Sequence, residues 1–507
     1  MHTPHFAAAM ARRQLLKSLA IGGLASVAGS GFAADASSGA FARSFAPLDG
    51  ALHAGPGEGG QWAVADIAIT GRLPEALRGT LYRNGPARFA LGSTRYQHWF
   101  DGDGMVQAFR LQGGKASYRG QLLRTPKLLE EEAAGRFLYP AFGTPMADAA
   151  PVRSADAVNP ANINLLPMQG GKSLYALWEA GSALQIDPDT LAAQGFKAWS
   201  PETQGAPFSA HPRIAPDGTV WNFGYSAHSG KLIIYEIAPG GQLRRQTLLD
   251  APQADMVHDF AITENHLVFL LMPLLAKPGA PPVGSLDRYE WQAQAPMLVM
   301  LVSKADFSVR RMELPNGGVF HIGNAWEDKG LIRLGYARYT EFLPHLKGLG
   351  LPSPTARLDQ LARWTQVEIN LAQGTARQFD VGLAGVEFPR FDARLTGQRS
   401  EFGVLMQNSG SAGNDQWGMD SVVTHSGTTT ARFRYGSDWI AEEHLYVPAP
   451  GSSASASGWV LGTALQKASG RTTLSVFEAD AIASGPVAQL ALPFGLPLGL
   501  HGQFVTA

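Results

Sequence analysis

The chain is divided along most of its length into short apolar or alternating runs, each bounded by turn residues. Representative runs are Thr219–Phe223, Lys231–Ile237, His266–Leu271, Met297–Val302 and Gly458–Gly462. Runs of this length and composition predict β-strands. A chain made of many such strands at regular spacing folds into a sandwich, a barrel or a propeller, so the sequence predicts an all-β protein.

The connections between these runs have explicit turn chemistry. Three of them combine a proline, whose φ is fixed, with Gly, Asn or Asp, which tolerate positive φ. They are Pro216-Asp217-Gly218, Pro239-Gly240-Gly241 and Pro315-Asn316-Gly317-Gly318. Helical patterns are few, and the best candidates are Leu128–Ala134 and Ala356–Trp364.

The length of 507 residues favours a propeller among the all-β architectures. A blade of four strands takes about 40–50 residues in common repeats. Spread over seven blades, this chain gives somewhat longer blades, so some loops must be long. Residues 61–507 are therefore predicted to form a single β-propeller domain, after a flexible lead-in rich in Gly, Ala and Ser at 37–60. The sequence shows no clear internal repeat, which is the main observation against a propeller.

The first 36 residues are typical of an export signal peptide. Arg12-Arg13-Gln14-Leu15-Leu16-Lys17 precedes an apolar run from Ser18 to Ala34, and Ala34-Asp35-Ala36 offers a cleavage site. The paired arginines resemble a twin-arginine signal of bacteria, which would deliver the folded protein to the periplasm. An ordinary secretory signal and an uncleaved anchor helix are the alternatives. The short, Gly- and Ala-rich run argues against the anchor.

Charge and cysteine content exclude several kinds of function. The 41 basic and 42 acidic residues give a formal charge of −1, so the chain lacks the excess of positive charge that is typical of nucleic-acid-binding proteins. The chain has no cysteine, so disulfides, thiolate metal sites and a cysteine nucleophile are excluded.

Four histidines, far apart along the chain, lie in short segments suited to holding a metal ion. The segments are Ala210-His211-Pro212, Val257-His258-Asp259-Phe260, Phe320-His321-Ile322-Gly323-Asn324 and Gly499-Leu500-His501-Gly502. Imidazole is the commonest metal ligand and suits Fe, Zn, Cu and Ni, although a single histidine is more often structural. The first three follow one another at about one blade length, and the last comes a few blades later. Because inner strands of successive blades line the propeller axis, one histidine per blade would surround one ion.

Six segments together resemble the carotenoid cleavage oxygenase family. Leu81–Pro86 and His98–Met105 are similar to its N-terminal signature. By its own pattern, Gln97–Met105 predicts a strand entering an Asp-Gly hairpin. The four histidine segments are similar to the iron-ligand segments of the family, in the same order. The resemblance runs from about Asp66 to Phe504.

This resemblance implies a seven-bladed propeller, with long loops and a few short helices capping one face, that holds one non-haem Fe(II) on its axis. The implied ligands are His211, His258, His321 and His501. The family also has three glutamates that hydrogen-bond the ligand imidazoles, and the matching residues are Glu179, Glu387 and Glu443, with Glu442 as an alternative to Glu443. A ligating histidine normally donates its other N–H to a carboxylate or carbonyl, which fixes its tautomer.

The activity that the resemblance implies is dioxygenation of a conjugated C=C bond, in a carotenoid, apocarotenoid or stilbene-like substrate, to give two carbonyl products. The partners would be O₂ and this apolar substrate, and no catalytic residue is required beyond the metal centre. Two alternatives stay open. One is an isomerase or another non-cleaving relative on the same iron propeller, and the other is a periplasmic propeller that binds ligands without catalysis.

Three residues bear on the access of substrate and O₂. The family often has Asn-Thr-Asn-Val where this chain has Asn162-Ile163-Asn164-Leu165, so the bulkier Ile163 stands where a threonine can shade the open side of the iron. This difference favours the isomerase alternative. Lignostilbene-cleaving relatives grip a phenol with Tyr and Lys, and Tyr96 and Lys127 are the candidates here.

A membrane contact is the final alternative that the sequence raises. The 25 Phe, 11 Trp and 12 Tyr are enough to line an apolar tunnel for a polyene. Leu270–Leu275, followed by a Pro- and Gly-rich loop to Val283, is either an apolar lip that collects substrate from a membrane or a buried strand that ends in a loop.

Overall fold

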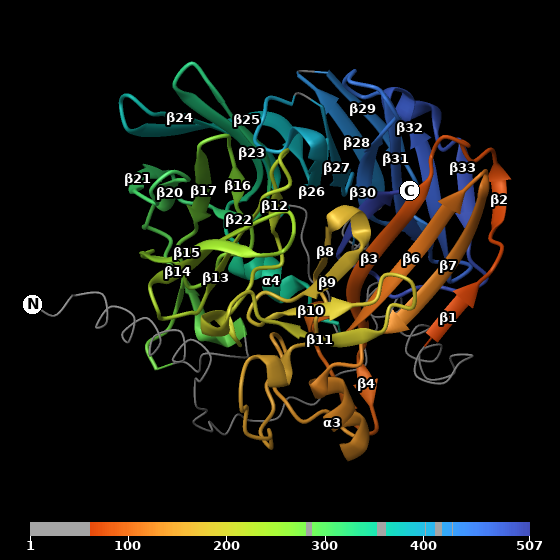
Figure 1. Cartoon of the computed structure of the whole chain (residues 1–507), viewed down its shortest axis with the longest axis horizontal. Coiled ribbons are helices and arrows are strands. Elements are labelled where there is room, and N and C mark those ends of the chain that lie inside the picture. Colours follow the sequence, from red (N-terminus) through yellow and green to blue (C-terminus); the bar gives the residue numbers. More distant parts are fainter. Residues whose placement is uncertain (1–60, 280–285, 352–360, 401, 411–417, 428) are drawn as a thin grey trace, which may run out of the picture.

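The computed structural model describes residues 61–279, 286–351, 361–400, 402–410, 418–427 and 429–507. These residues form seven antiparallel sheets of four or five strands, arranged around a common centre (Figure 1). The all-β class and the seven-bladed propeller are therefore confirmed. The predicted export signal at 1–36 and lead-in at 37–60 lie outside the described residues.

The blades follow the chain in order, and each has its innermost strand at one end of its sheet. The first contains β34 (His501–Thr506), β3 (Gly79–Arg88), β6 (Asp103–Gln112), β7 (Lys115–Leu122) and β1 (Gln61–Val64), from inside to outside. The second contains β8 (Asn164–Met168), β9 (Ser173–Leu177), β10 (Ala183–Ile186) and β11 (Ala193–Lys197). The third contains β12 (Arg213–Ile214), β13 (Val220–Tyr225), β14 (Lys231–Ile237) and β15 (Leu243–Asp250).

The remaining blades have the same arrangement. The fourth contains β16 (Ala261–Ile262), β17 (His266–Leu271), β20 (Met297–Ser303) and β21 (Val309–Leu314). The fifth contains β22 (Gly318–Asp328), β23 (Leu331–Tyr339), β24 (Arg363–Asn370) and β25 (Thr375–Ala384). The sixth contains β26 (Val386–Phe391), β27 (Phe402–Gln407), β28 (Ser421–Ser426) and β29 (Thr429–Arg434). The seventh contains β30 (Trp439–Pro448), β31 (Gly458–Gln466), β32 (Arg471–Glu478), β33 (Ala488–Ala491) and β2 (Ala68–Gly71).

Strands from opposite ends of the chain close the ring. β2 pairs with β33 at the outer edge of the seventh blade, and β34 pairs with β3 at the inner edge of the first. In Figure 1 the red β2 lies beside the blue β33. Each pairing satisfies the backbone groups of a strand edge that would otherwise be exposed. The two pairings therefore hold the first and last blades together.

The core consists of apolar layers between neighbouring blades, and β17 shows how the sequence builds them. Val268 and Leu270 pack in one buried cluster, whereas Leu267, Phe269 and Leu271 pack in another. Successive side chains of a strand point to opposite faces, so a blade with neighbours on both sides needs a continuous apolar run. Burying each such side chain contributes about 1.5–3 kcal/mol.

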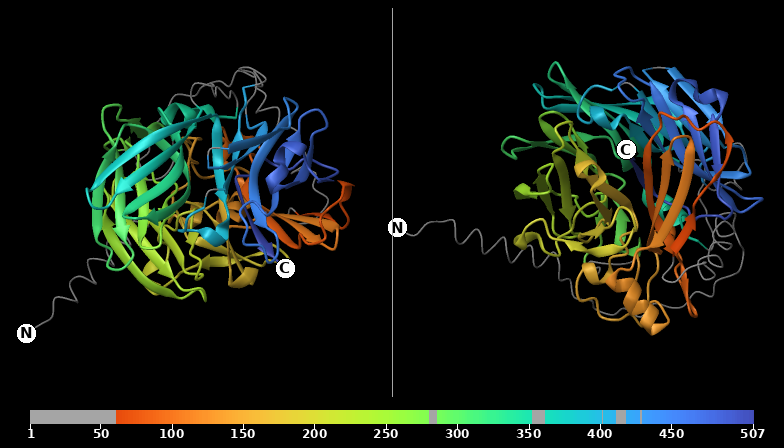
Figure 2. Two further views of the ribbon diagram at one scale, coloured as in Figure 1. Left: turned by 90° about the horizontal axis from the view of Figure 1, so that it is seen from above. Right: turned by 45° about the vertical axis from the view of Figure 1, so that its right-hand side comes forward.

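One predicted helix is confirmed. It is α3 (Pro126–Ala134), whose first turn is capped by the Thr125 hydroxyl and which ends at Gly135 with a φ of 67°. Such a left-handed residue is the usual reason for glycine after a helix. Figure 2 shows α3, in orange, beyond the edge of the sheets. The other α-helix of the described residues is α4 (Leu343–Gly348).

Two predictions of local structure were wrong. The helix predicted at Ala356–Trp364 does not reach its stated end, because Arg363 and Trp364 begin β24; most of the remainder lies outside the described residues. The hairpin predicted at Gln97–Met105 is instead a 3-10 turn, η1 (Trp99–Asp101), followed by β6. The His98 ring accepts a hydrogen bond from the Phe100 backbone, which favours the tight turn over an extended strand.

The segment Leu270–Leu275 is a buried strand end. Leu270, Leu271, Met272 and Leu274 are all buried, and the chain continues into β18 (Leu274–Ala276), which pairs with β19 (Tyr289–Trp291). Because these side chains are buried, they do not form an apolar surface that could contact a membrane. Residues 280–283 of the predicted loop lie outside the described part. None of the described helices has the length and apolar composition needed to cross a bilayer.

Candidate metal centre

The structure brings together the four histidines that the sequence singled out. Their candidate ligand nitrogens all lie within 4.8 Å of one another, and all four side chains are buried. The Nε2 atoms of His211 and His258 are 2.9 Å apart, and those of His321 and His501 are 3.2 Å apart. The four imidazoles thus form one four-nitrogen centre.

Each histidine comes from the inner edge of a different blade. His211 and His258 lie just before the innermost strands β12 and β16, whereas His321 lies within β22 and His501 begins β34. The inner strands of a propeller face the common axis, so residues far apart in sequence meet there. This placement gives a physical basis for the wide spacing of the four segments.

Irregular strand pairing turns several site residues toward the axis. The register of β22 shifts between Val319 and Ile322, on either side of His321. Similar shifts occur in β26 between Glu387 and Arg390, and in β30 beside Glu443. Such bulges bend a strand and redirect its side chains, and they are common beside active sites.

The three predicted glutamates bind three of the imidazoles. Glu179 lies 2.6 Å from Nδ1 of His258, Glu387 lies 2.5 Å from Nδ1 of His321, and Glu443 lies 2.9 Å from Nδ1 of His501. Glu179 follows β9 of the second blade, and the other two lie in the innermost strands of the sixth and seventh blades. Together with the histidines they provide one residue from each of the seven blades.

Glu442 has a different role from its neighbour Glu443. Its carboxylate accepts hydrogen bonds from the backbone of Gly499 and the hydroxyl of Thr463, and it forms an ion pair of 3.0 Å with Arg83. Glu442 therefore holds the segment that leads into His501, and the alternative to Glu443 is ruled out.

The hydrogen bonds to Glu387 and Glu443 define where the lone pairs of two imidazoles point. A neutral imidazole that donates its Nδ1 proton to a carboxylate keeps a lone pair on Nε2. His321 and His501 both have this arrangement, and their Nε2 atoms face each other across 3.2 Å. Two lone pairs at that distance repel each other, and a cation between them removes the repulsion. The donor set therefore fits a metal ion.

Burial keeps the imidazoles of His211 and His501 in the neutral form that binds a metal. It lowers the pKa of His501 to about 4 despite the opposing effect of Glu443, and it holds the pKa of His211 well below its ordinary value. Burial alone would raise the pKa of Glu443, but Arg390 and His501 lower it to about 2. At neutral pH these imidazoles are uncharged and this carboxylate is ionised.

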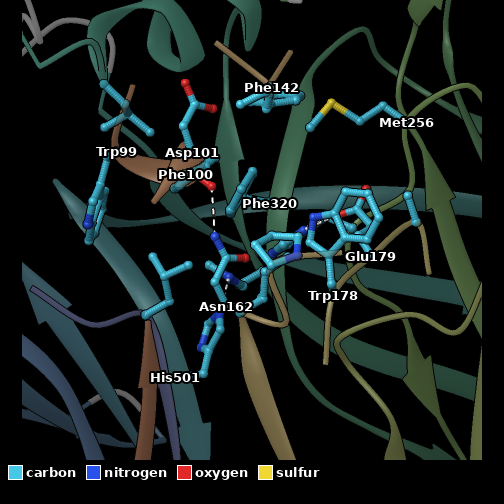
Figure 3. A pocket seen from close by; sticks show the side chains of 18 of the residues that line it. Trp99, Phe100, Asp101, Phe142, Asn162, Trp178, Glu179, Met256, Phe320 and His501 are labelled. Atoms are coloured by element: carbon cyan, nitrogen blue, oxygen red, sulfur yellow. Dashed lines mark hydrogen bonds and ion pairs between the residues drawn. The ribbon is translucent and has the colours of Figure 1, made fainter. Parts of the chain in front are cut away.

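A cavity of about 280 Å³ lies beside the centre and is lined by three of its histidines, His258, His321 and His501. Figure 3 shows Trp99 on one side of it and Trp178 with Glu179 on the other. Phe320 stacks on His258 with ring centres 4.0 Å apart, and aromatic and aliphatic side chains make up much of the remaining wall. A cavity of this kind suits an apolar ligand with few polar groups.

Two of the three residues predicted to govern substrate and O₂ access line the cavity, and the third does not. Ile163 and Lys127 both line the cavity. The Lys127 ammonium lies 2.8 Å from Asp103 and 2.7 Å from Glu131. Tyr96 lies behind it, away from the cavity wall. Its ring stacks on the ring of Phe137 with centres 3.8 Å apart, and this packing buries the Tyr96 side chain completely. Tyr96 is not among the residues that line the cavity. The prediction that Tyr96 faces the substrate was therefore wrong.

Several buried amides position the site and were missed in the sequence. Asn162 donates to the backbone carbonyls of Phe100 and Gly102, and the first of these bonds is drawn in Figure 3. Asn164 donates to the carbonyl of Ala210, directly before His211. Both amides flank Ile163, and two polar residues at the start of an apolar strand were a signal that could have identified them.

Comparison with known proteins gives a consistent result. Residues 58–506 match the family model described as retinal pigment epithelial membrane protein. The chain is 31% identical over 485 residues to the apocarotenoid-15,15'-oxygenase of Synechocystis. The aligned region covers 91% of this chain and 97% of the relative. It is 28% identical to a lignostilbene-alpha,beta-dioxygenase of Sphingomonas paucimobilis, covering 88% of this chain and 94% of the relative.

The solved structures agree. The cobalt-substituted Synechocystis enzyme superposes with a TM-score of 0.79 at 26% identity, covering 92% of this chain and 98% of the other. That relative, which has this fold, is known in a cobalt-substituted form. The chain therefore belongs to the carotenoid cleavage oxygenase family, which the matching family model names after the retinal pigment epithelial membrane protein.

Proposed function

We propose that this protein is a non-haem Fe(II) dioxygenase that cleaves a conjugated C=C bond of a carotenoid, apocarotenoid or stilbene-like substrate into two carbonyl products. The observation that carries the proposal is the four-imidazole centre beside an apolar cavity. The names of the relatives, which include oxygenases of apocarotenoids and lignostilbenes, support it. Iron, when bound, supplies the activation of O₂ that such a cleavage requires.

The chain itself contributes positioning and exclusion of water. The Nε2 atoms of His211, His258, His321 and His501 would hold the metal. The three glutamates hold the Nδ1 protons of their imidazoles and so fix the ring orientations. Phe320 and Phe388 stack on His258 and His321, and they shield these rings on the side of the cavity. The apolar wall orients a conjugated substrate and keeps bulk water away from the reacting bond.

Lys127 favours a phenolic stilbene within this substrate range. Burial would lower its pKa, but Asp103 and the other nearby acidic groups raise it above the ordinary value, so the amine stays protonated. A charged donor on the wall of an apolar cavity can hydrogen-bond a phenol oxygen. Purely hydrocarbon polyenes would gain nothing from this group.

Metal analysis followed by isotope labelling tests the proposal. We expect about one iron per chain after reconstitution, because the four nitrogens form one site. Incubation under ¹⁸O₂ with resveratrol-like stilbenes and with apocarotenals should place label in the carbonyl products. Iron with unlabelled, isomerised product would instead support the isomerase alternative, which the bulk of Ile163 at the cavity favours. A chain that takes up no iron would be a binding propeller without this catalysis.

We also propose that residues 1–36 direct export to the periplasm by the twin-arginine route. The support is the Arg12-Arg13 pair ahead of an apolar run. Cell fractionation should find the protein in the periplasm, and the double substitution Arg12→Lys and Arg13→Lys should retain it in the cytoplasm. Unchanged export of the double variant would indicate another route.

A further inference from the structure

Two tyrosines at the cavity wall hydrogen-bond the carboxylates that hold the metal-binding imidazoles. The hydroxyl of Tyr225 donates to Glu179, whose other oxygen accepts from His258. The hydroxyl of Tyr339 lies 2.7 Å from one oxygen of Glu387, whose other oxygen accepts from His321. Each tyrosine is the last residue of the second strand of its blade, β13 or β23, and both line the cavity.

The third carboxylate is held in a different way. Glu443 accepts a hydrogen bond from the backbone of Gly502 at 2.8 Å, and Arg390 lies 3.6 Å away. Two of the three imidazole–carboxylate pairs thus include a phenol, and Glu387 also accepts from the Phe388 backbone at 2.8 Å. The third pair has a backbone N–H and an arginine in place of the phenol.

We propose that Tyr225 and Tyr339 are positioning residues that fix the carboxylates of Glu179 and Glu387, and through them the imidazoles of His258 and His321, for metal binding. A carboxylate with one oxygen bound to a phenol cannot rotate freely about its last bond. Its second oxygen then stays aligned with the Nδ1 proton of the imidazole. The Nε2 lone pair is directed at the metal as a result.

The proposal rests on the metal centre proposed above, so its test measures metal binding rather than turnover. The variants are Tyr225→Phe and Tyr339→Phe, which remove one hydroxyl each. The control is Tyr435→Phe, because the Tyr435 hydroxyl also bonds a histidine, His444 at 2.8 Å, that is not part of the centre. The dissociation constant for Co²⁺ is measured by chelator competition, and the visible absorption spectrum of the cobalt protein reports the ligand geometry.

We expect both site variants to bind Co²⁺ about 10-fold more weakly, at the lower end of the effect of removing an outer hydrogen-bond partner, and to show an altered cobalt spectrum. Tyr435→Phe should match the unaltered protein in both measurements. Unchanged affinity and spectra in both site variants would overturn the inference while leaving the metal centre intact. Absence of Co²⁺ binding by the unaltered protein would overturn the metal centre itself, and this inference with it.

A double-mutant cycle separates positioning from a general structural effect. If Tyr339 acts through Glu387, removing its hydroxyl in a Glu387→Gln background should cause much less than the roughly 10-fold loss seen alone, because contacting residues of one network are not additive. Full additivity of the two substitutions would mean that Tyr339 affects the metal by another path, and it would overturn the assignment for that residue.

Discussion

Arg213 and Asp259 form a largely buried ion pair that connects three of the four histidine segments. One guanidinium nitrogen of Arg213 lies 2.8 and 2.9 Å from the two oxygens of Asp259. The same nitrogen donates to the carbonyl of Ile322, and Asp259 accepts from the Ile322 backbone at 2.7 Å. Each of these three residues lies one or two positions after a histidine of the centre. The pair therefore fixes the third, fourth and fifth blades relative to one another at the axis.

Removal of this carboxylate should destabilise the metal-free protein. In Asp259→Ala the Arg213 guanidinium keeps its charge but loses its partner, and such a loss costs about 3–5 kcal/mol. The free energy of unfolding from urea titrations measures the effect. The control is Asp189→Ala, which breaks the exposed pair with Arg110 and should change stability little. Equal stability of the two variants would show that the pair at the axis is energetically unimportant.

Removal of a metal ligand should differ sharply from removal of its hydrogen-bond partner. His258→Ala should abolish stoichiometric iron binding, whereas Glu387→Gln should weaken it by about 10–100-fold, because the introduced amide would still offer one acceptor oxygen to the His321 imidazole. Iron content after dialysis against a graded series of chelator concentrations measures both. His228→Ala, at an exposed histidine, serves as the control. A His258 variant with full iron occupancy would refute its assignment as a ligand.

The sequence was sufficient to predict the architecture and the four histidines that meet at its centre. The runs at Lys231–Ile237 and His266–Leu271 coincide with β14 and β17, because a strand buried between two blades must be apolar throughout. His211 and His258 were recognisable because the order of the segments matched a family. Glu443 could not be separated from Glu442 in the sequence, since only the pairing of β30 decides which carboxylate faces His501.

Other features could not be predicted because they depend on contacts distant in sequence. A bulge such as the one beside Glu387 leaves the strand pattern almost unchanged, yet it decides where the side chain points. Tyr225 of the third blade reaches Glu179 of the neighbouring second blade, and nothing in the flanks of either residue indicates the pair. The prediction for Tyr96 failed because its ring stacks on Phe137 and does not face the cavity, and the sequence does not show which rings will stack.

Stability of the metal-free protein should fall as the pH drops from about 6.5 to about 4. Burial lowers the pKa of His98 and of His444 to about 4. In this window the unfolded chain binds protons that the folded chain does not, so each group reduces stability by up to about 3 kcal/mol on acidification. Asp101 acts in the opposite direction, since burial raises its pKa to about 7.

Urea titrations at about pH 7.5, 6 and 5 test this pH dependence. His444→Gln should flatten the dependence by removing one of the groups, although it also loses the bond to Tyr435. His228→Gln, at an exposed position, should keep the original slope. A His444 variant whose stability falls as steeply as that of the unaltered protein would contradict the assignment of this residue as a contributor.

The side chain of Ile163 should limit the access of O₂ to the metal. It lines the cavity together with His258 and His501. Ile163→Thr replaces the ethyl branch of this side chain by a hydroxyl, at a position where the family often has threonine. We expect kcat/KM for O₂ to rise by up to about 10-fold, equivalent to about 1.4 kcal/mol, with unchanged iron content. Initial rates at graded O₂ concentrations in an oxygen electrode measure this. Val158→Ala, which also enlarges the buried wall of the cavity, controls for volume alone. An equal rise in both variants would mean that cavity size, rather than shading by Ile163, governs the reaction with O₂.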